Sequence, residues 1–290
     1  MQDLQLQLAR LREKARARAA AAPDTSFAER LERLRVPSGP TARATATALA
    51  ASLGGAIVAP GLVERTWTFP LPHRHGDVGI ESGERLAAAA RSVARLDDPV
   101  APGSLLFLDT ETTGLAGGTG TVAFVVGLAW LEGEALRLVQ WLMASFAAEQ
   151  ALVGRVRERF ARAAVLVTFN GKSFDLPLLK ARARLAGSEL GAENVVHLDL
   201  LHCTRRLLHS GWPDCRLRTA EAQALRLERV DDLPGAAAPG AWRRWLDRGD
   251  GSLLGRVLEH NRADLLSLAA LLALMERPAR REAPLLHAAA

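Results

Sequence analysis

The sequence predicts an α/β fold in which helices flank a mixed β-sheet. Three strand candidates follow one another between Leu105 and Met143, and Gly133 marks a hairpin turn between the second and the third. From there to Asp199, helical patterns alternate with short apolar strands. Strands joined by a hairpin pair antiparallel, whereas strands joined through a helix pair parallel. The sheet is therefore expected to contain both arrangements.

The first hundred residues are predicted to form a mostly helical N-terminal extension whose role stays open. Residues 1–35 have helical spacing, and residues 36–60 show little periodicity. Val63–Leu71 alternates as an edge strand does and ends among prolines, and Glu81–Leu96 has the pattern of a further helix. The residues DDPVAPGS at 97–104 are typical of a linker.

The remaining elements belong to one domain, predicted over residues 101–276, and residues 277–290 are expected to be a short C-terminal tail. The predicted elements are the strand Leu105–Asp109, the strand Thr121–Leu131, the strand Ala135–Met143, the helix Ala147–Ala163, the strand Val165–Phe169, the helix Phe174–Leu185, the strand Val195–Asp199 and helices up to Met275. No internal repeat interrupts this order.

The composition of the 290-residue chain is that of a globular protein, with 49% hydrophobic and 24% charged residues. The formal net charge of +5 permits a nucleic-acid partner without requiring one. Two cysteines exclude a disulfide scaffold and a four-thiolate zinc site, and they fit reduced thiols. The apolar run Leu265–Met275 is too short to span a bilayer, so we expect a cytoplasmic protein without a membrane partner. The oligomeric state stays open.

Four carboxylates lie at the ends of predicted elements: Asp109 and Glu111 after the first strand, Asp175 after the fourth, and Asp264 in the last helix. Alternate residues of an extended chain share a face, so Asp109 and Glu111 project together. Carboxylates in a partly dry site repel one another, and divalent cations remove that penalty. Mg²⁺ or Mn²⁺ prefers such oxygen ligands, and two ions can hold both reacting oxygens of a phosphodiester displacement.

His260 lies four residues before Asp264, which places the two side chains on one face of a helix. A histidine at this position can accept a proton from an attacking water, because its side chain titrates near neutral pH.

Three segments resemble the exonuclease motifs of the DEDD superfamily, which has a ribonuclease H-like fold: LDTETTGLAGGTG, FNGKSFDLPLL and HNRADLLSLAAL. HLDLLHCTRRL, CRLRTAE, VDDLPG and the glycine loop Gly117–Gly120 resemble, more narrowly, the YprB-type ribonuclease H-like domain. The similarity covers about residues 103–275. It implies a two-metal nuclease, usually acting from a 3′ end, with two divalent cations, Mg²⁺ or Mn²⁺.

Carried over by motif, the resemblance implies that the metal is held by Asp109, Glu111, Asp175 and Asp264. It makes His260 the candidate base. Exonucleases with a catalytic histidine usually place it five residues before the last aspartate, whereas the separation here is four, a spacing more familiar with tyrosine. The alternative is that His260 orients a water or the scissile phosphate.

Residues beside these acids are candidates for contacting the substrate: Thr112, Thr113, Gly114, Asn170, Lys172 and Asp199. Backbone N–H groups after the first motif can hold a nucleotide, or these residues simply cap a loop. Asn170 holds a turn in the alternative interpretation, and Asp199 caps the helix that begins at Leu200.

Aromatic side chains near the motifs offer surfaces on which a base can stack. For Phe124 and Phe174 we nevertheless expect packing in the core. Trp242 and Trp245 are expected in a satellite core, with the wall of a substrate groove as the alternative.

The sequence thus predicts a metal-dependent nuclease of DNA or RNA, and the resemblance makes it a 3′–5′ exonuclease. A non-catalytic nucleic-acid-binding module of the same fold and a small-nucleotide phosphoesterase are the alternatives. The presence of all four acids favours the nuclease, because a module that has lost catalysis commonly loses one of them.

Overall fold

The structure is a computed structural model that describes residues 40–114 and 120–276. The chain separates into two compact units, Met1–Ala42 and Arg43–Ala290. The helix predicted over residues 1–35 and the tail predicted over residues 277–290 lie outside the described residues.

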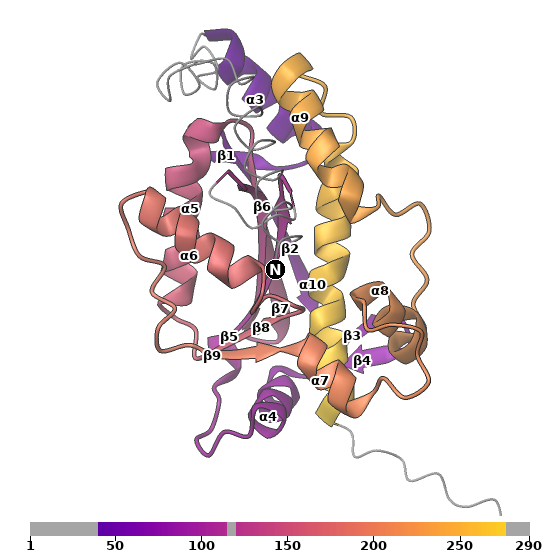
Figure 1. Cartoon of the computed structure of the whole chain (residues 1–290). Coiled ribbons are helices and arrows are strands. Elements are labelled where there is room, and N and C mark those ends of the chain that lie inside the picture. The colour runs from indigo at the N-terminus through magenta and orange to yellow at the C-terminus, as the bar shows by residue number, and fades with distance from the viewer. Residues whose placement is uncertain (1–39, 115–119, 277–290) are drawn as a thin grey trace, which may run out of the picture. The chain divides into compact units, whose positions relative to one another are not determined.

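A seven-stranded mixed sheet forms the centre of the second unit (Figure 1). Its strands are β1 (Ala56–Ala59), β2 (Leu62–Pro70), β5 (Leu105–Thr112), β6 (Ala123–Glu132), β7 (Ala135–Met143), β8 (Val165–Thr168) and β9 (Val196–Asp199). They lie side by side in the order β1-β2-β7-β6-β5-β8-β9. Neighbours from β1 to β5 are antiparallel, whereas β8 is parallel to both β5 and β9. The predicted α/β fold with a mixed sheet is confirmed.

The strand β2 lies inside the sheet, so its predicted edge position was wrong. It pairs with β1 on one side and along its whole length with β7 on the other. The true edge is β1, which has only the four residues Ala56–Ala59 and lies in a segment without clear periodicity. An alternating pattern identifies a strand with one face more buried than the other, but it does not reveal a further short strand beyond it.

Helices cover both faces of the sheet (Figure 1). Helices α5 (Glu149–Phe160) and α6 (Asp175–Leu185) lie on one face, and α10 (Leu254–Glu276) lies on the other, where it also packs against α4 (Gly83–Ala94). The remaining helices are α3 (Pro40–Ser52), α7 (Leu200–Leu207), α8 (Leu217–Ala220) and α9 (Ala238–Arg248). A small hairpin of β3 (His73–His75) and β4 (Val78–Ile80) packs against α10.

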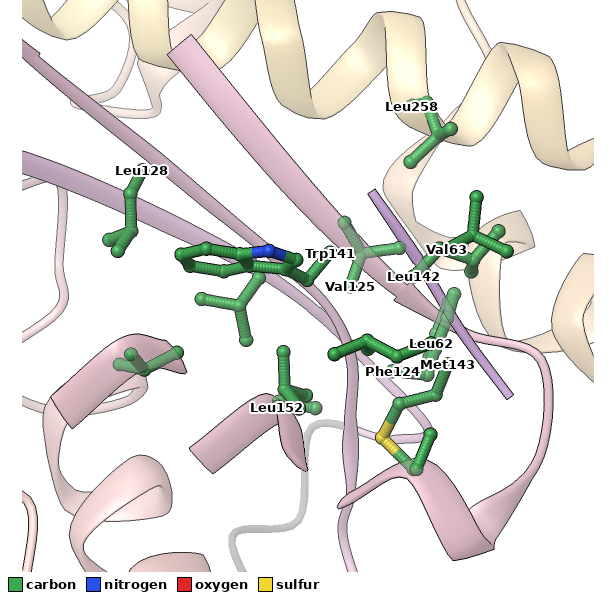
Figure 2. Packing of buried hydrophobic residues seen from close by; sticks show 14 of the residues in the cluster. Leu62, Val63, Phe124, Val125, Leu128, Trp141, Leu142, Met143, Leu152 and Leu258 are labelled. Atoms are coloured by element: carbon green, nitrogen blue, oxygen red, sulfur yellow. The ribbon is translucent and has the colours of Figure 1, made fainter. Parts of the chain in front are cut away.

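The core consists of two buried clusters. In the first, side chains of β2, β6 and β7 gather with Leu152 of α5 and Leu258 of α10 (Figure 2). Burial of each such leucine contributes roughly 1.5–3 kcal/mol to stability. The second cluster lies between the sheet, α4 and the C-terminal half of α10. Clusters on both faces explain why β5 and β6 are continuous apolar runs rather than alternating ones.

Aromatic residues of the first cluster belong to the core, as predicted. Phe124 is fully buried and stacks on Trp242, with ring centroids 5.0 Å apart. The indole N–H groups of Trp242 and Trp245 donate to the backbone oxygens of Met143 and Ala144, at 2.6 Å and 2.8 Å. These side chains therefore fasten α9 to the end of β7 and do not line a groove.

None of the helices within the described ranges combines the length and the apolar character that crossing a membrane requires.

Candidate active site

Asp109 and Glu111 both lie within β5, which extends beyond its predicted end to Thr112. In the antiparallel register they lie opposite Gly127 and Val125 of β6. Glu111 is buried, and Asp109 is partly exposed. Two carboxylates are thus placed at the end of the central strand, at alternate positions as expected.

Asn261 of α10 holds Asp109, a role that the sequence analysis missed. Its Nδ2 donates to the backbone oxygen of Asp109 at 3.1 Å and to Oδ2 at 2.6 Å. Its Oδ1 accepts from Nε2 of Gln140 at 2.6 Å, so the orientation of the amide is fixed from both ends. The signal in the sequence was an asparagine directly after His260 and three residues before Asp264, and the structure shows that this asparagine is fully buried.

Gly127 of β6 allows α10 to approach the sheet at this point. A Cβ at Gly127 would overlap Oδ1 of Asn261 and lie 2.7 Å from Cδ1 of Leu265. Only glycine leaves room for the helix, and this close approach brings the third motif to the first.

Asp175 is the first residue of α6 and is buried, as its place after the fourth predicted strand indicated. Its Oδ1 accepts a hydrogen bond from Oγ1 of Thr110 at 2.5 Å. Thr110 therefore ties the second motif to β5, between the two acids of the first motif. A carboxylate in the first turn of a helix also interacts favourably with the helix dipole.

Asp264 lies in α10 and is paired with a cation that the sequence analysis did not single out. Nη2 of Arg229 contacts Oδ1 of Asp264 and Oε1 of Glu221, and Nη1 lies 3.7 Å from Oδ2 of Asp232. The side chain of Arg229 is 9% exposed. One guanidinium thus serves three carboxylates.

His260 lies one turn before Asp264 and faces two carboxylates. Its Nδ1 is 2.7 Å from Oδ1 of Asp232, and its Nε2 is 3.8 Å from Oδ2 of Asp264. Nη1 of Arg229 is also 3.3 Å from Nδ1. Nδ1 cannot both donate to Asp232 and accept from Arg229. Because the contact with Asp232 is the shorter one, we assign the proton to Nδ1, which donates it to Asp232. Nε2 is then left with a lone pair on the side of Asp264.

Glu221 and its neighbours form a polar chain behind Arg229. Glu221 is 1% exposed, and its Oε1 accepts from Oγ of Ser267 at 2.5 Å. Nε2 of His75 lies 2.9 Å from the same hydroxyl. Burial and, after it, the charge of Arg229 lower the pKa of His75 to about 4, so the ring is neutral at pH 7. Because the serine proton is directed at Glu221, the ring donates its Nε2–H to the hydroxyl.

The acids of the first two motifs lie in an unfavourable electrostatic environment. Burial raises the pKa of Asp109 well above its usual value, and repulsion from Asp264, Asp175 and Glu111 raises it further. The pKa of Glu111 is raised by burial and then by Asp264 and Asp175. For Asp175, burial raises the pKa to about 6, although the Thr110 hydroxyl opposes the change. The site therefore holds more negative charge than its own cations offset.

The donor set fits a divalent cation in its chemistry. Carboxylate oxygens are the ligands that Mg²⁺ prefers, and a cation would relieve the repulsion that raises these pKa values. Among the residues that the structure describes, no three His, Cys, Asp or Glu side chains already form a coordination shell. The acids lie close enough to raise one another's pKa values. To coordinate one ion together, their side chains would have to move closer to one another.

Contacts of the substrate candidates after the first motif are internal to their loop. Oγ1 of Thr112 donates to the backbone oxygen of Gly114 at 3.0 Å, and Oγ1 of Thr113 accepts from the backbone N–H of Val122 at 3.0 Å. These bonds favour loop capping over substrate contact. Residues 115–119, which include most of the glycine loop, lie outside the described residues.

Asp199 is buried, and its carboxylate is occupied by the backbone. Its Oδ1 accepts from the N–H groups of Asn170 and Leu201 at 2.7 Å and 3.0 Å, and its Oδ2 accepts from that of Lys172 at 3.0 Å. Asp199 thus caps α7 and anchors the turn at Asn170, whose φ of 65° is left-handed. The contacts favour the structural interpretation of Asp199 and Asn170.

Two side chains of the second motif remain available to a ligand. Lys172 is exposed, and Phe174 is 44% exposed, directly before Asp175. The expectation that Phe174 packs in the core was wrong. It lies at the N-cap position of α6, from which its ring does not reach the buried face of the helix.

Comparisons with known proteins identify the family of this chain. A family model described as the RNase_H superfamily matches residues 106–276. The uncharacterized protein YprB of Bacillus subtilis (strain 168) is 34% identical over 208 residues, which are 70% of this chain and 50% of YprB. The chain thus spans about half the length of that relative.

A solved structure, the family B DNA polymerase from the hyperthermophilic archaeon Pyrobaculum calidifontis, matches 84% of this chain and 34% of the polymerase chain. Its TM-score is 0.45 and its identity 13%. The family match covers more than half of the chain and includes all four acids of the site. The chain therefore belongs to the RNase_H superfamily and carries a ribonuclease H-like domain of the YprB type.

Proposed function

We propose that this protein is a metal-dependent nuclease that hydrolyses phosphodiester bonds of DNA or RNA, acting as a 3′–5′ exonuclease. One observation carries the proposal: acids from three distant segments gather at the end of β5, where burial and mutual repulsion raise the pKa values of three of them. The membership of the superfamily supports nuclease chemistry, because nucleases of this fold generally use divalent metals.

The residues that would hold the cations are Asp109, Glu111, Asp175 and Asp264. Bound Mg²⁺ or Mn²⁺, two ions by the resemblance of the motifs, would supply positive charge beside the phosphoryl and leaving oxygens. Asn261 fixes the carboxylate of Asp109 through Nδ2, and Thr110 fixes that of Asp175 through its hydroxyl. These hydrogen bonds link β5, α6 and α10, and they thus set the positions of Asp109 and Asp175 before a substrate arrives.

In this proposal Nε2 of His260 accepts the proton of the attacking water. Asp232 accepts the Nδ1–H of the ring, so the lone pair of Nε2 is free, and the same carboxylate stabilises the imidazolium after proton transfer. This is the arrangement of a general base whose tautomer is held by a carboxylate.

The exposed side chains of Lys172 and Phe174 lie just before Asp175 in the chain, and we assign them to contacts with the substrate. An ammonium group suits a phosphate of the backbone, and a phenyl ring suits stacking with a base. Both contacts are independent of base identity, which fits a nuclease that does not select a sequence.

The test is a cleavage assay of the whole protein with Mg²⁺ or Mn²⁺ on single- and double-stranded DNA and RNA, labelled at either end. We expect stepwise loss of nucleotides from the 3′ end, abolished by EDTA. Asp109→Ala and Asp175→Ala should lower the rate at least about a hundredfold. The matched control is Glu158→Gln, which changes an exposed acid of α5 that pairs with Arg155, and this variant should cleave as the wild type does.

Three outcomes would reject the proposal. Equal cleavage by the wild type and both aspartate variants would place the activity outside these acids. Nucleic-acid binding without cleavage under every metal condition would favour the non-catalytic module. Hydrolysis restricted to mono- or dinucleotides would favour the small-nucleotide phosphoesterase.

A further inference from the structure

Arg229 is the cation whose guanidinium directly contacts an acid of the proposed metal site. Its Nη2 is shared by Asp264 and Glu221, and its Nη1 lies 3.7 Å from Asp232. By contrast, no cationic side chain forms an ion pair with Asp109, Glu111 or Asp175 within the described ranges. The acids of the site therefore fall into a compensated group around Arg229 and an uncompensated group on β5 and α6.

Arg229 occupies one of the two carboxylate oxygens through which Asp264 would bind a divalent cation. Oδ1 of Asp264 already accepts from Nη2, and a charge-assisted hydrogen bond of this kind is roughly twice as strong as a neutral one. Oδ2 faces Nε2 of His260 at 3.8 Å. A cation that binds Asp264 through Oδ1 must therefore displace the guanidinium or share the carboxylate with it.

The surroundings of Arg229 allow it to release Asp264 without becoming an unpaired buried charge. Glu221 stays fixed behind it by the hydroxyl of Ser267, and Asp232 is within reach of Nη1. Its Nε has no hydrogen-bond partner in the described part of the chain, so the side chain is anchored only through its two Nη atoms. Removing one of three acidic partners leaves two, which is far less costly than leaving a buried charge alone.

We propose that Arg229 is an internal counter-ion of Asp264 that a divalent cation displaces on binding, so that this arginine sets the affinity of the site for the metal. The inference rests on the proposed function for the identity of the metal ligands. It makes Arg229 a positioning residue: in the metal-free protein it holds Asp264 in place, and in the metal-bound protein it turns to Glu221 and Asp232.

The experiment is a Mn²⁺ titration of the whole protein in which free Mn²⁺ is measured by electron paramagnetic resonance, without substrate. Arg229→Gln keeps an amide donor and removes the charge. We expect it to bind Mn²⁺ at least about tenfold more tightly than the wild type, a change of about 1.4 kcal/mol. The control is Arg65→Gln. Arg65 of β2 pairs with Glu259, which lies on α10 as Asp264 does, but Arg65 forms no ion pair with an acid of the site among the described residues.

A double variant tests whether the effect passes through Asp264. In an Asp264→Asn background, Arg229→Gln should change the affinity for Mn²⁺ less than twofold, since the competition no longer exists. An undiminished gain in this background would overturn the proposal. So would a wild-type affinity in Arg229→Gln, a weaker one, or the absence of Mn²⁺ binding in every protein.

A second measurement uses the wild-type protein and so does not depend on whether a variant of Arg229 folds. In the wild-type protein, Mg²⁺ should shift the ¹⁵N resonance of the Arg229 guanidinium and speed exchange of its protons, because Nη2 leaves Asp264. An unchanged resonance at saturating Mg²⁺ would overturn the proposal. Both measurements detect the cation rather than cleavage, so tighter binding in Arg229→Gln without nuclease activity would reject the proposed function alone.

Discussion

Asp175→Asn is expected to stabilise the metal-free protein while it abolishes the proposed activity. Burial raises the pKa of Asp175 from 3.8 to about 6, so the folded state binds this proton more tightly than the unfolded chain does. The difference of about 2 pKa units corresponds to about 3 kcal/mol of lost stability. This loss is small below pH 4, grows between pH 4 and pH 6 and levels off above pH 6. Asparagine removes the charge and keeps an oxygen that accepts from Thr110.

The assay is urea denaturation of both proteins in EDTA at pH 4 and pH 8. We expect Asp175→Asn to gain up to about 3 kcal/mol at pH 8 and little at pH 4. The matched control is Asp199→Asn, which weakens a buried cap that accepts three backbone N–H groups and should lose about 1–3 kcal/mol. A destabilised Asp175→Asn protein, or a gain that does not depend on pH, would refute the reasoning.

Three further changes test the supports of the site. Gly127→Ala should lower the free energy of unfolding by about 1–3 kcal/mol, because its methyl group collides with Asn261 and Leu265; urea denaturation equal to wild type would contradict the close approach. Asn261→Ala should cost about 1–3 kcal/mol and slow cleavage, since Asp109 loses its donor; an unaffected cleavage rate would argue against positioning. His260→Gln should lower kcat by about 10²–10⁴-fold at an unchanged Tm, and a wild-type kcat in a cleavage assay would remove its role as base.

Much of the fold follows from local pattern. The strands β5 and β6 are apolar along nearly their whole length because both faces of the sheet are covered, and such runs are visible in the sequence. The acids were found for a similar reason, since Asp109 ends an apolar run within β5 and Asp175 follows β8 after a short turn. The edge strand β1 was missed because four residues carry too little pattern to be recognised.

The supporting residues of the site were harder to find because their partners are distant in the sequence. Arg229 contacts Asp264, which lies 35 residues away, and nothing in its own segment has helical or strand periodicity. The one available signal was an arginine close to two acids in the sequence, Glu221 and Asp232. Asp232 also contacts Nδ1 of His260. A role of this kind depends on packing between elements, which the order of residues does not encode locally.

The exposure of Phe174 shows the limit of reasoning from hydrophobicity. A phenylalanine beside a buried aspartate was expected in the core, yet its position just before the first turn of α6 leaves it 44% exposed. The ring is therefore accessible to a ligand rather than packed in the core, and its place directly before Asp175, not its exposure alone, makes it a candidate for binding. Only the start of the helix at Asp175, seen in the structure, distinguishes the two.

The most direct test of the account is a crystal structure of the protein with Mn²⁺, with the ions located by anomalous scattering. The account predicts anomalous peaks in contact with carboxylate oxygens of Asp109 and Asp175, and Asp264 turned from Arg229 toward the metal. Crystals in which these oxygens bind no ion at saturating Mn²⁺, with Arg229 still on Asp264, would contradict it.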